Sequence, residues 1–299
     1  MKPHKMYQFS HLGRPVDLRF RTNRIISILM LVSGIVAFVA AFITDMGFSN
    51  ALSALFVTAF ATFITWALAR EIDPDHDWSA FVAVVLVWLA LLYFTDSSSA
   101  RPIPQLGWLS MGLILASTRI VSRIIGLPLR ISDSVLVLVG IAMAVFFDNW
   151  VIALIPIAAL FLDGIMVNPL RRHLAFSGLA SVMVILWVQF RGFPETQGLA
   201  SAYIVAVTIV SAGFFLTIAA TRKITSVPDL DTYTLDIRRI RAAMILALAA
   251  GLVSVLWHGD NAVITLLPLW CAMIAVAVYR VPITVQEWMA YRKRKVQPA

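Results

Sequence analysis

Ten apolar segments occupy most of this chain and constrain its fold more than any other feature of the sequence. A helix of about 20 apolar residues crosses the roughly 30 Å of hydrocarbon in a bilayer, and most of the segments come close to that length. The composition agrees, since 60% of the residues are hydrophobic and only 13% are charged. The sequence therefore predicts an all-α integral membrane protein with about ten transmembrane helices. The segments are Ile25–Thr44, Ala51–Leu68, Ser79–Phe94, Gly107–Ile124, Ser134–Phe147, Trp150–Val167, Leu174–Phe190, Leu199–Ala220, Ala242–Trp257 and Ala262–Tyr279.

Short connections rich in turn-forming residues join these segments in pairs. Asp45–Gly47, Gly192–Pro194 and His258–Asn261 are of this kind. Such connections predict five antiparallel helical hairpins. One hairpin has an alternative: Ser134–Phe147 is short, about 21 Å as a helix, so residues 134–167 would fit either a full crossing or a re-entrant loop.

Lysine and arginine fall almost entirely in alternate loops. Of the 24, only Arg101 and Arg191 lie in the other set of loops. Short loops rich in these residues stay in the cytoplasm, so both termini are predicted to be cytoplasmic. The expected organisation is a basic N-terminal tail (1–24), a transmembrane bundle (25–279) and a basic interfacial C-terminal tail (280–299). The expected location is the cell membrane, which in a bacterium is the inner membrane, with multiple crossings.

The net charge of +8 is spread over several loops and forms no basic stripe with interleaved aromatic residues. That pattern excludes nucleic acid as the predicted partner and favours the anionic headgroups of membrane lipids at the cytoplasmic face. The one cysteine, Cys271, lies inside an apolar segment, so no disulfide within the chain is expected. The sequence gives no indication of the oligomeric state.

The densest polar stretch lies between the second and third segments. Four carboxylates and an imidazole within a few positions supply ligands suited to Mg²⁺, which makes this loop a candidate metal site. The alternative is ordinary: Asp77 or Ser79 caps the next helix, and the other acids are solvated. The candidate metal ligands are Glu71, Asp73, Asp75, His76 and Asp77.

A second candidate site combines arginines with an acid inside an apolar segment. Arg119 and Arg123 are four residues apart and share one helical face, and Arg70 and Arg130 lie in nearby loops. Asp163 lies near the cytoplasmic end of its segment, where Arg119 or Arg123 is the expected partner, because ionisable groups within spans are usually paired. These cations could receive a phosphate or carboxylate. The alternative is that Arg119 and Arg123 extend to the membrane surface as lipid-facing side chains.

Three functional classes fit these features. The favoured one is transport of a small solute. An anionic solute would match the positive charge of the candidate arginines. An alternative is a membrane-embedded, metal-dependent enzyme acting on a lipid or lipid-linked phosphate at the cytoplasmic face, and a third is a non-catalytic assembly protein. The acidic loop has neither the paired Asp-rich signatures of membrane prenyltransferases nor the signature of CDP-alcohol phosphotransferases. Whether the protein is an enzyme is left open by the sequence.

Overall fold

The computed structural model describes Tyr7 and residues 9–95, 103–147, 149–193, 195–230 and 233–280. Within these residues the secondary structure is entirely helical. The helices are α1 (Arg21–Ile43), α2 (Phe48–Ile72), α3 (Asp77–Phe94), α4 (Trp108–Ser122), α5 (Ile131–Phe146), α6 (Trp150–Ile165), α7 (Arg172–Arg191), α8 (Ser201–Ala220) and α9 (Ile237–Thr265), followed by Leu267–Arg280. Most of the predicted C-terminal tail, residues 281–299, lies outside the described part.

Each of the ten predicted apolar segments corresponds to one helix, which confirms the all-α class. Six helices are long and apolar enough to cross a membrane, and four are shorter apolar helices: α4, α5, α6 and Leu267–Arg280. The predicted break at residues 258–261 is also present, because Gly259 interrupts α9 with a non-helical conformation. Residues 134–167 form two separate helices, α5 and α6, joined by a short connection.

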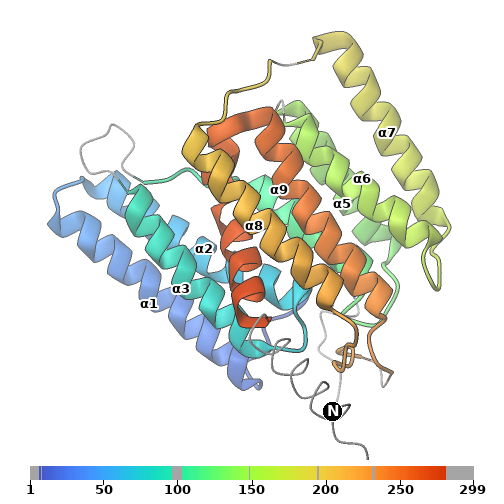
Figure 1. Ribbon diagram of the computed structural model, residues 1–299, viewed down its shortest axis with the longest axis horizontal. Helices are drawn as coiled ribbons and strands as arrows, with labels where there is room; N and C mark the ends of the chain where they lie inside the picture. Colours follow the sequence, from blue (N-terminus) through green and yellow to red (C-terminus); the bar gives the residue numbers. More distant parts are fainter. Residues whose placement is uncertain are drawn as a thin grey trace, which may run out of the picture.

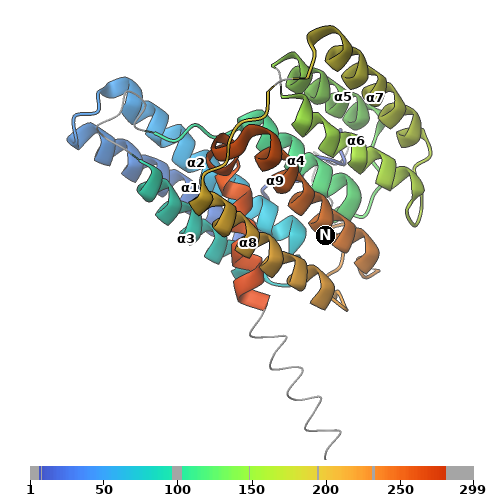
Figure 2. The ribbon, with the colours of Figure 1, turned by 45° about the horizontal axis from the view of Figure 1, so that its top comes forward.

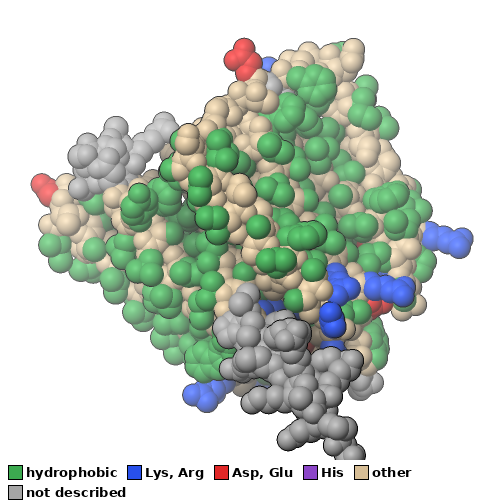
Figure 3. Space-filling view, viewed as in Figure 1, with side chains coloured by type: hydrophobic (Ala, Val, Ile, Leu, Met, Phe, Trp, Pro, Cys, Tyr) green, Lys and Arg blue, Asp and Glu red, His purple; other side chains and the backbone are tan. Residues whose placement is uncertain are grey.

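The outer surface of the bundle is apolar. Figure 3 shows hydrophobic side chains over the flanks of the molecule, while Lys and Arg gather towards one end. Helix α1 is the clearest case, since it buries only Ile26, Gly34 and Ala41 and exposes large side chains such as Leu31. A water-soluble fold would not leave such a continuous apolar surface uncovered. The surface is that of a helical protein surrounded by lipid.

The helices pack around a central group formed by α4, α6 and α9. Helix α4 contacts α6, α9 and α2, and buries most of its residues. Helices α1, α2 and α3 lie on one side of the molecule and α5, α6 and α7 on the other, with α8 and α9 between them (Figures 1 and 2). Glycines permit the closest contacts: a Cβ at Gly140 would lie 2.8 Å from Leu113. The centre is therefore built from helices that are far apart in the sequence.

Sequential pairing describes only part of this arrangement. Helices α1 and α2 pack together, as do α5 and α6, but α7 packs on α6 and α5, while α8 packs on α9. Among the described residues, the predicted α3–α4 and α7–α8 hairpins are thus not packed pairs. The connection between α7 and α8 is instead attached to the α9 turn, where the Gln197 amide donates to the Trp257 carbonyl at 2.9 Å. Gly259, with φ +52°, lies so close to the Gly198 carbonyl that no larger residue fits.

The cation-rich segments meet at one end of the bundle, here called the basic end. It consists of the N-terminal segment (7, 9–20) and the loop residues 73–76, 123–130, 166–171, 221–230 and 233–236. Contacts join these segments directly: the Asp229 amide donates to the Ile124 carbonyl at 3.0 Å, and the Thr225 amide donates to the Asp75 carboxylate at 3.1 Å. The loops that the sequence assigns to one side of the membrane therefore lie together in space.

Candidate functional site

Asp163 is the centre of a buried charge cluster at the basic end. It lies in the last turn of α6 and is fully buried. Arg123, which follows the end of α4, donates to both its carboxylate oxygens at 2.8 and 2.9 Å, and Arg239 in the first turn of α9 donates at 2.7 Å. His173 Nδ1 lies 2.9 Å from the same carboxylate. The predicted pairing with Arg123 is present, and Arg239 and His173 are partners that the sequence did not indicate.

The remaining donors of the two arginines bind main-chain carbonyls near helix ends. Arg123 donates to the Asn168 carbonyl at 3.0 Å, and Arg239 donates to Val121 and Val167 at 3.1 and 2.6 Å. The two arginines and Asp163 together carry one more positive than negative charge. Carbonyls at helix C-termini carry partial negative charge, which compensates for part of this excess.

Ser134, His173 and Asp163 lie next to one another in the order found in serine hydrolases. The Ser134 hydroxyl lies 2.9 Å from His173 Nε2. All three residues are fully buried, Asp163 is also bound by two arginines, and in the described part of the chain none of the three lines the cleft beside Arg14 or the two small cavities near Glu71. A nucleophile needs an approach for its substrate. We therefore assign these three residues a structural role, in which their contacts hold α5, α6 and α7 in position.

A second ion pair joins α2 to α4. Arg119 Nε donates to Glu71 at 2.8 Å, and the Ser122 hydroxyl donates to the other carboxylate oxygen at 3.4 Å. Glu71 is almost fully buried, and Arg14 of the N-terminal segment lies 4.0 Å away. Arg119 and Arg123 thus serve different acids, although they were predicted to act together on one helical face.

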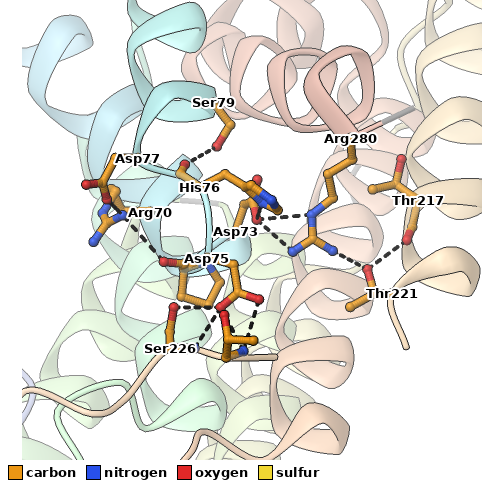
Figure 4. Close-up of polar contacts among 12 residues, drawn as sticks. Arg70, Asp73, Asp75, His76, Asp77, Ser79, Thr217, Thr221, Ser226 and Arg280 are labelled. Atoms are coloured by element: carbon orange, nitrogen blue, oxygen red, sulfur yellow. Dashed lines mark hydrogen bonds and ion pairs between the residues drawn. The ribbon is translucent and has the colours of Figure 1, made fainter. Parts of the chain in front are cut away.

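A third ion pair joins the end of α2 to the last helix. Arg280 donates twice to one oxygen of the buried Asp73, at 2.6 and 3.0 Å, and also binds the Thr221 hydroxyl (Figure 4). His76 Nδ1 lies 2.9 Å from the same oxygen. Burial alone would raise the pKa of Asp73, but the His76 hydrogen bond and the Arg280 charge outweigh it and lower the pKa. The hydrogen bond to Asp73 correspondingly raises the pKa of His76.

The other two acids of this loop point to separate partners. Asp75 accepts from the Ser226 amide and hydroxyl at 2.8 and 2.6 Å, which attaches the loop after α8 to the loop after α2 (Figure 4). Asp77 pairs with Arg70. It lies in the first turn of α3, where His76 is the capping position, and neither Asp77 nor Ser79 provides the side-chain cap that was considered.

The five candidate metal ligands therefore do not converge. In the described part of the chain, no three His, Cys, Asp or Glu side chains are grouped as they would be around a metal ion. Three of the four acids have arginine as their main counter-charge: Arg119 for Glu71, Arg280 for Asp73 and Arg70 for Asp77. Mg²⁺ binding by this loop stays a prediction, and the geometry favours ion pairs between helices.

Arg130 belongs to a different set of contacts, with the N-terminal segment. Its Nε donates to His11 at 3.2 Å, and its amide donates to the buried Asp133 at 3.1 Å. Asp133 also accepts from the Ser10 hydroxyl at 2.6 Å and from the His11 amide at 2.9 Å. Leu12 is buried in the main core. The segment is thus packed across the basic end, where the sequence suggested only a basic tail.

The same segment is fastened at its other side to the loop after α8. Arg14 donates to both oxygens of Asp229 at 2.7 Å, and the Tyr7 hydroxyl donates to Asp229 at 3.3 Å. Burial, and then the charge of Asp229, raise the pKa of Tyr7 to about 12. Arg14 and Asp229 are remote in sequence, and nothing local to either one signals the contact.

A cleft of about 750 Å³ opens beside the ion pair of Arg14 and Asp229. It is lined by the N-terminal segment with the start of α1, by the end of α2 with the following loop and the start of α3, by Ile124 after α4, and by residues 226–230 and Leu235. Two residues predicted as site candidates line it: Arg70, a candidate for substrate binding, and Asp77, a candidate metal ligand. Trp66, which is largely buried, also lines the cleft, and no acceptor for its indole N–H is present among the described residues.

Comparison with protein-family models, with curated proteins and with solved structures finds no match to this chain. The site itself is therefore the basis for any functional conclusion.

Proposed function

We propose that the protein is a multi-pass transporter of the cell membrane that moves a small solute carrying an anionic group. The basic end and both termini face the cytoplasm in this proposal. The orientation is supported by the 24 Lys and Arg residues, all but two of which belong to alternate loops. Anionic lipid headgroups are the proposed partners of the exposed cations at that end.

The observation that carries the transport proposal is the cluster of Asp163, Arg123 and Arg239. It brings buried charges from α4, α6 and α9 together near the membrane boundary. Ionisable groups inside membrane-spanning helices are costly, and they commonly mark the paths of substrates or ions. A purely structural contact between three apolar helices would not require charged side chains.

The ion pairs provide a physical basis for a gate. They connect α6 to α4 and α9, α2 to α4, and α2 to the last helix. If α6 moved away from α4, Arg123 would lose its carboxylate partner, and breaking a buried pair costs about 3–5 kcal/mol. An anionic solute offers a replacement for the Asp163 carboxylate. Opening of the basic end therefore becomes favourable when the solute binds, which couples the two events.

Transport can be tested in liposomes that contain the purified protein. Swelling is followed by light scattering in iso-osmotic potassium phosphate, succinate or glutamate, with valinomycin to carry potassium. We expect at least one salt to enter faster than in liposomes without protein. Arg123→Gln should abolish this entry, whereas Arg222→Gln, which changes an exposed cation at the same end, should retain it. Entry no faster than in empty liposomes for every salt would contradict the proposal.

A second candidate is a membrane-embedded enzyme that acts on a lipid or lipid-linked phosphate. The observation in its favour is that Glu71 and Arg119, both expected at the inner surface in that case, are 2.8 Å apart. Under this proposal Mg²⁺ or Mn²⁺ raises the melting temperature of the wild type but not of the Asp73→Asn/Asp75→Asn double variant. An unchanged wild-type melting temperature over millimolar metal argues against it. A non-catalytic assembly protein predicts neither metal stabilisation nor solute entry.

A further inference from the structure

The N-terminal segment lies over the ion pair of Glu71 and Arg119. The Leu12 carbonyl accepts from Arg119 at 3.4 Å, and Arg14 lies 4.0 Å from Glu71. Glu71 is almost fully buried, although it lies in the last turn of α2 at the basic end of the bundle. The segment is therefore part of the cover that separates this ion pair from solvent.

Arg123 lies beside the same segment. Together with Glu71 and Arg119 it lines a small cavity of about 10 Å³, and His11 of the segment lines the same cavity. A space of this size holds about one water molecule. Arg123 is also the arginine whose carboxylate partner an anionic solute would replace. The space beside it becomes large enough for a solute only when one of its walls moves.

The segment is the wall of this space that is held least firmly. Residues 9–20 form no helix, and of the described residues in the segment only Leu12 is buried. The opposite walls belong to α2 and α4, which bury most of their residues in the bundle. Parts of a protein with few buried apolar contacts open locally while the remainder stays folded. The segment can therefore move without disruption of the helices beneath it.

Two acids from different elements fasten the segment. Asp133 of α5 accepts from the Ser10 hydroxyl at 2.6 Å, and Asp229 in the loop after α8 accepts from Arg14 at 2.7 Å. The Arg14 and Asp229 side chains remain 23% and 24% exposed. Ion pairs that water reaches contribute little to stability, so this second attachment can break and re-form readily.

We propose that residues 9–20 form a lid over the cytoplasmic end of the path by which the solute reaches Arg123. The lid is closed in this structure, and it opens when its attachments to Asp133 and Asp229 are released. Opening joins the small cavity beside Arg123 to the cytoplasm. The role as a gate rests on the proposed transport function, whereas the opening itself is measured independently of transport.

Opening is measured by the reaction of a buried thiol with N-ethylmaleimide on the full chain in detergent. Ser122→Cys is a nearly isosteric change at a residue that is 1% exposed and donates to Glu71. Cys271 is buried in a different apolar cluster and reports any general loosening in the same sample. Mass spectrometry of the labelled peptides separates the two sites. We expect the thiol at position 122 to react faster than Cys271, because the lid opens locally.

Weakening either attachment should increase the rate of labelling at position 122. Asp229→Asn removes the charge that pairs with Arg14, and Ser10→Ala removes the donor to Asp133. Each should raise this rate about tenfold, because a hydrogen bond to a charged group is worth about that factor. The rate at Cys271 should remain unchanged.

Arg19→Gln is the control, because it changes an exposed cation of the same segment that pairs with Asp17 of the segment itself. It should label like the wild type at both positions. The lid is refuted if Asp229→Asn and Ser10→Ala both leave the rate at position 122 unchanged. It is equally refuted if the rate at Cys271 rises in parallel, since the whole bundle would then have loosened.

A reversible tether tests the role as a gate. Arg14→Cys/Asp229→Cys replaces two side chains that are in contact, and dithiobis(maleimidoethane) joins the two thiols through a disulfide that a reductant cleaves. In the liposome assay the tethered protein should admit no solute, and reductant should restore entry. Arg14→Cys alone, treated with the same reagent, has no second thiol at the lid and should retain entry.

Failure of the lid and failure of transport give different results. Fast labelling at position 122 without solute entry in any protein removes the transport proposal and leaves the lid in place. Solute entry that continues while the tether is intact leaves transport in place and removes the lid as its gate.

Discussion

Asp163 shows how one acid can organise the ends of several helices. It accepts hydrogen bonds from two arginines and lies beside His173, so three other helix ends depend on its single charge. The pairing with Arg123 was predictable, because an acid inside an apolar segment needs a cation at the same depth. Arg239 was not, since every cation in its loop is already explained by the preference of Lys and Arg for cytoplasmic loops.

The stability of the cluster should be asymmetric. Asp163→Asn leaves two buried arginines without a carboxylate, so we expect it to destabilise the protein by about 3–5 kcal/mol. Arg123→Gln should cost less, because Arg239 and His173 still surround the acid. Unfolding of the purified protein in mixed micelles provides the measurement. Equal effects of the two substitutions would show that Asp163 does not hold both arginines.

The contact between His76 and Asp73 should make stability depend on pH. The pKa of His76 is raised in the folded protein, so its contribution is fully present below the ordinary value of about 6.5. That contribution is lost as the pH rises through the folded pKa. We expect the melting temperature of the wild type to fall over this interval, and His76→Gln to remove that part of the fall. A wild-type profile that matches the variant would refute the assignment.

At the scale of elements, the helices themselves were predictable and their neighbours were not. Long apolar runs have to form helices, because an unpaired backbone inside lipid is too costly, and this determined the number and approximate bounds of all ten. The position of α7 depends on side-chain packing against α6, which no local pattern reveals. The acidic loop was misleading for a similar reason: Glu71, Asp73 and Asp77 look like one group in the sequence, but each has a different arginine partner in space.

The attachment of the α7–α8 connection to α9 gives a prediction at this scale. Gly259→Ala places a Cβ 2.0 Å from the Gly198 carbonyl and forces alanine into a left-handed conformation, so we expect a loss of at least about 1–3 kcal/mol. Gly213→Ala is the matched control, because its Cβ would meet open space on α8. The two melting temperatures should differ clearly, and equal values would show that residues 197–198 do not pack on the turn.

For the whole molecule, the division of charge predicts how the chain is oriented in the membrane. Cys271 is buried, so a cysteine introduced at the surface can be labelled against a low background. Lys223→Cys lies at the basic end and Glu195→Cys in the connection between α7 and α8. In intact cells an impermeant maleimide should label position 195 and leave position 223 unmodified until the membrane is opened. The reverse pattern would invert the proposed topology.

The contacts at the basic end also have a consequence for how the protein is made. Asp73 and Arg280 are 207 residues apart, and Arg14 and Asp229 are separated by 215. During synthesis, Asp73 therefore remains without Arg280 until the last helix has entered the membrane. A chain that stops before Arg280 leaves the Asp73 carboxylate inside the bundle without its arginine, and we expect cellular quality control to degrade such a chain. In a pulse–chase experiment the truncated chain should therefore disappear faster than the full chain. Asp73→Asn should slow the degradation of the truncated chain, because an asparagine at this position carries no charge that needs Arg280.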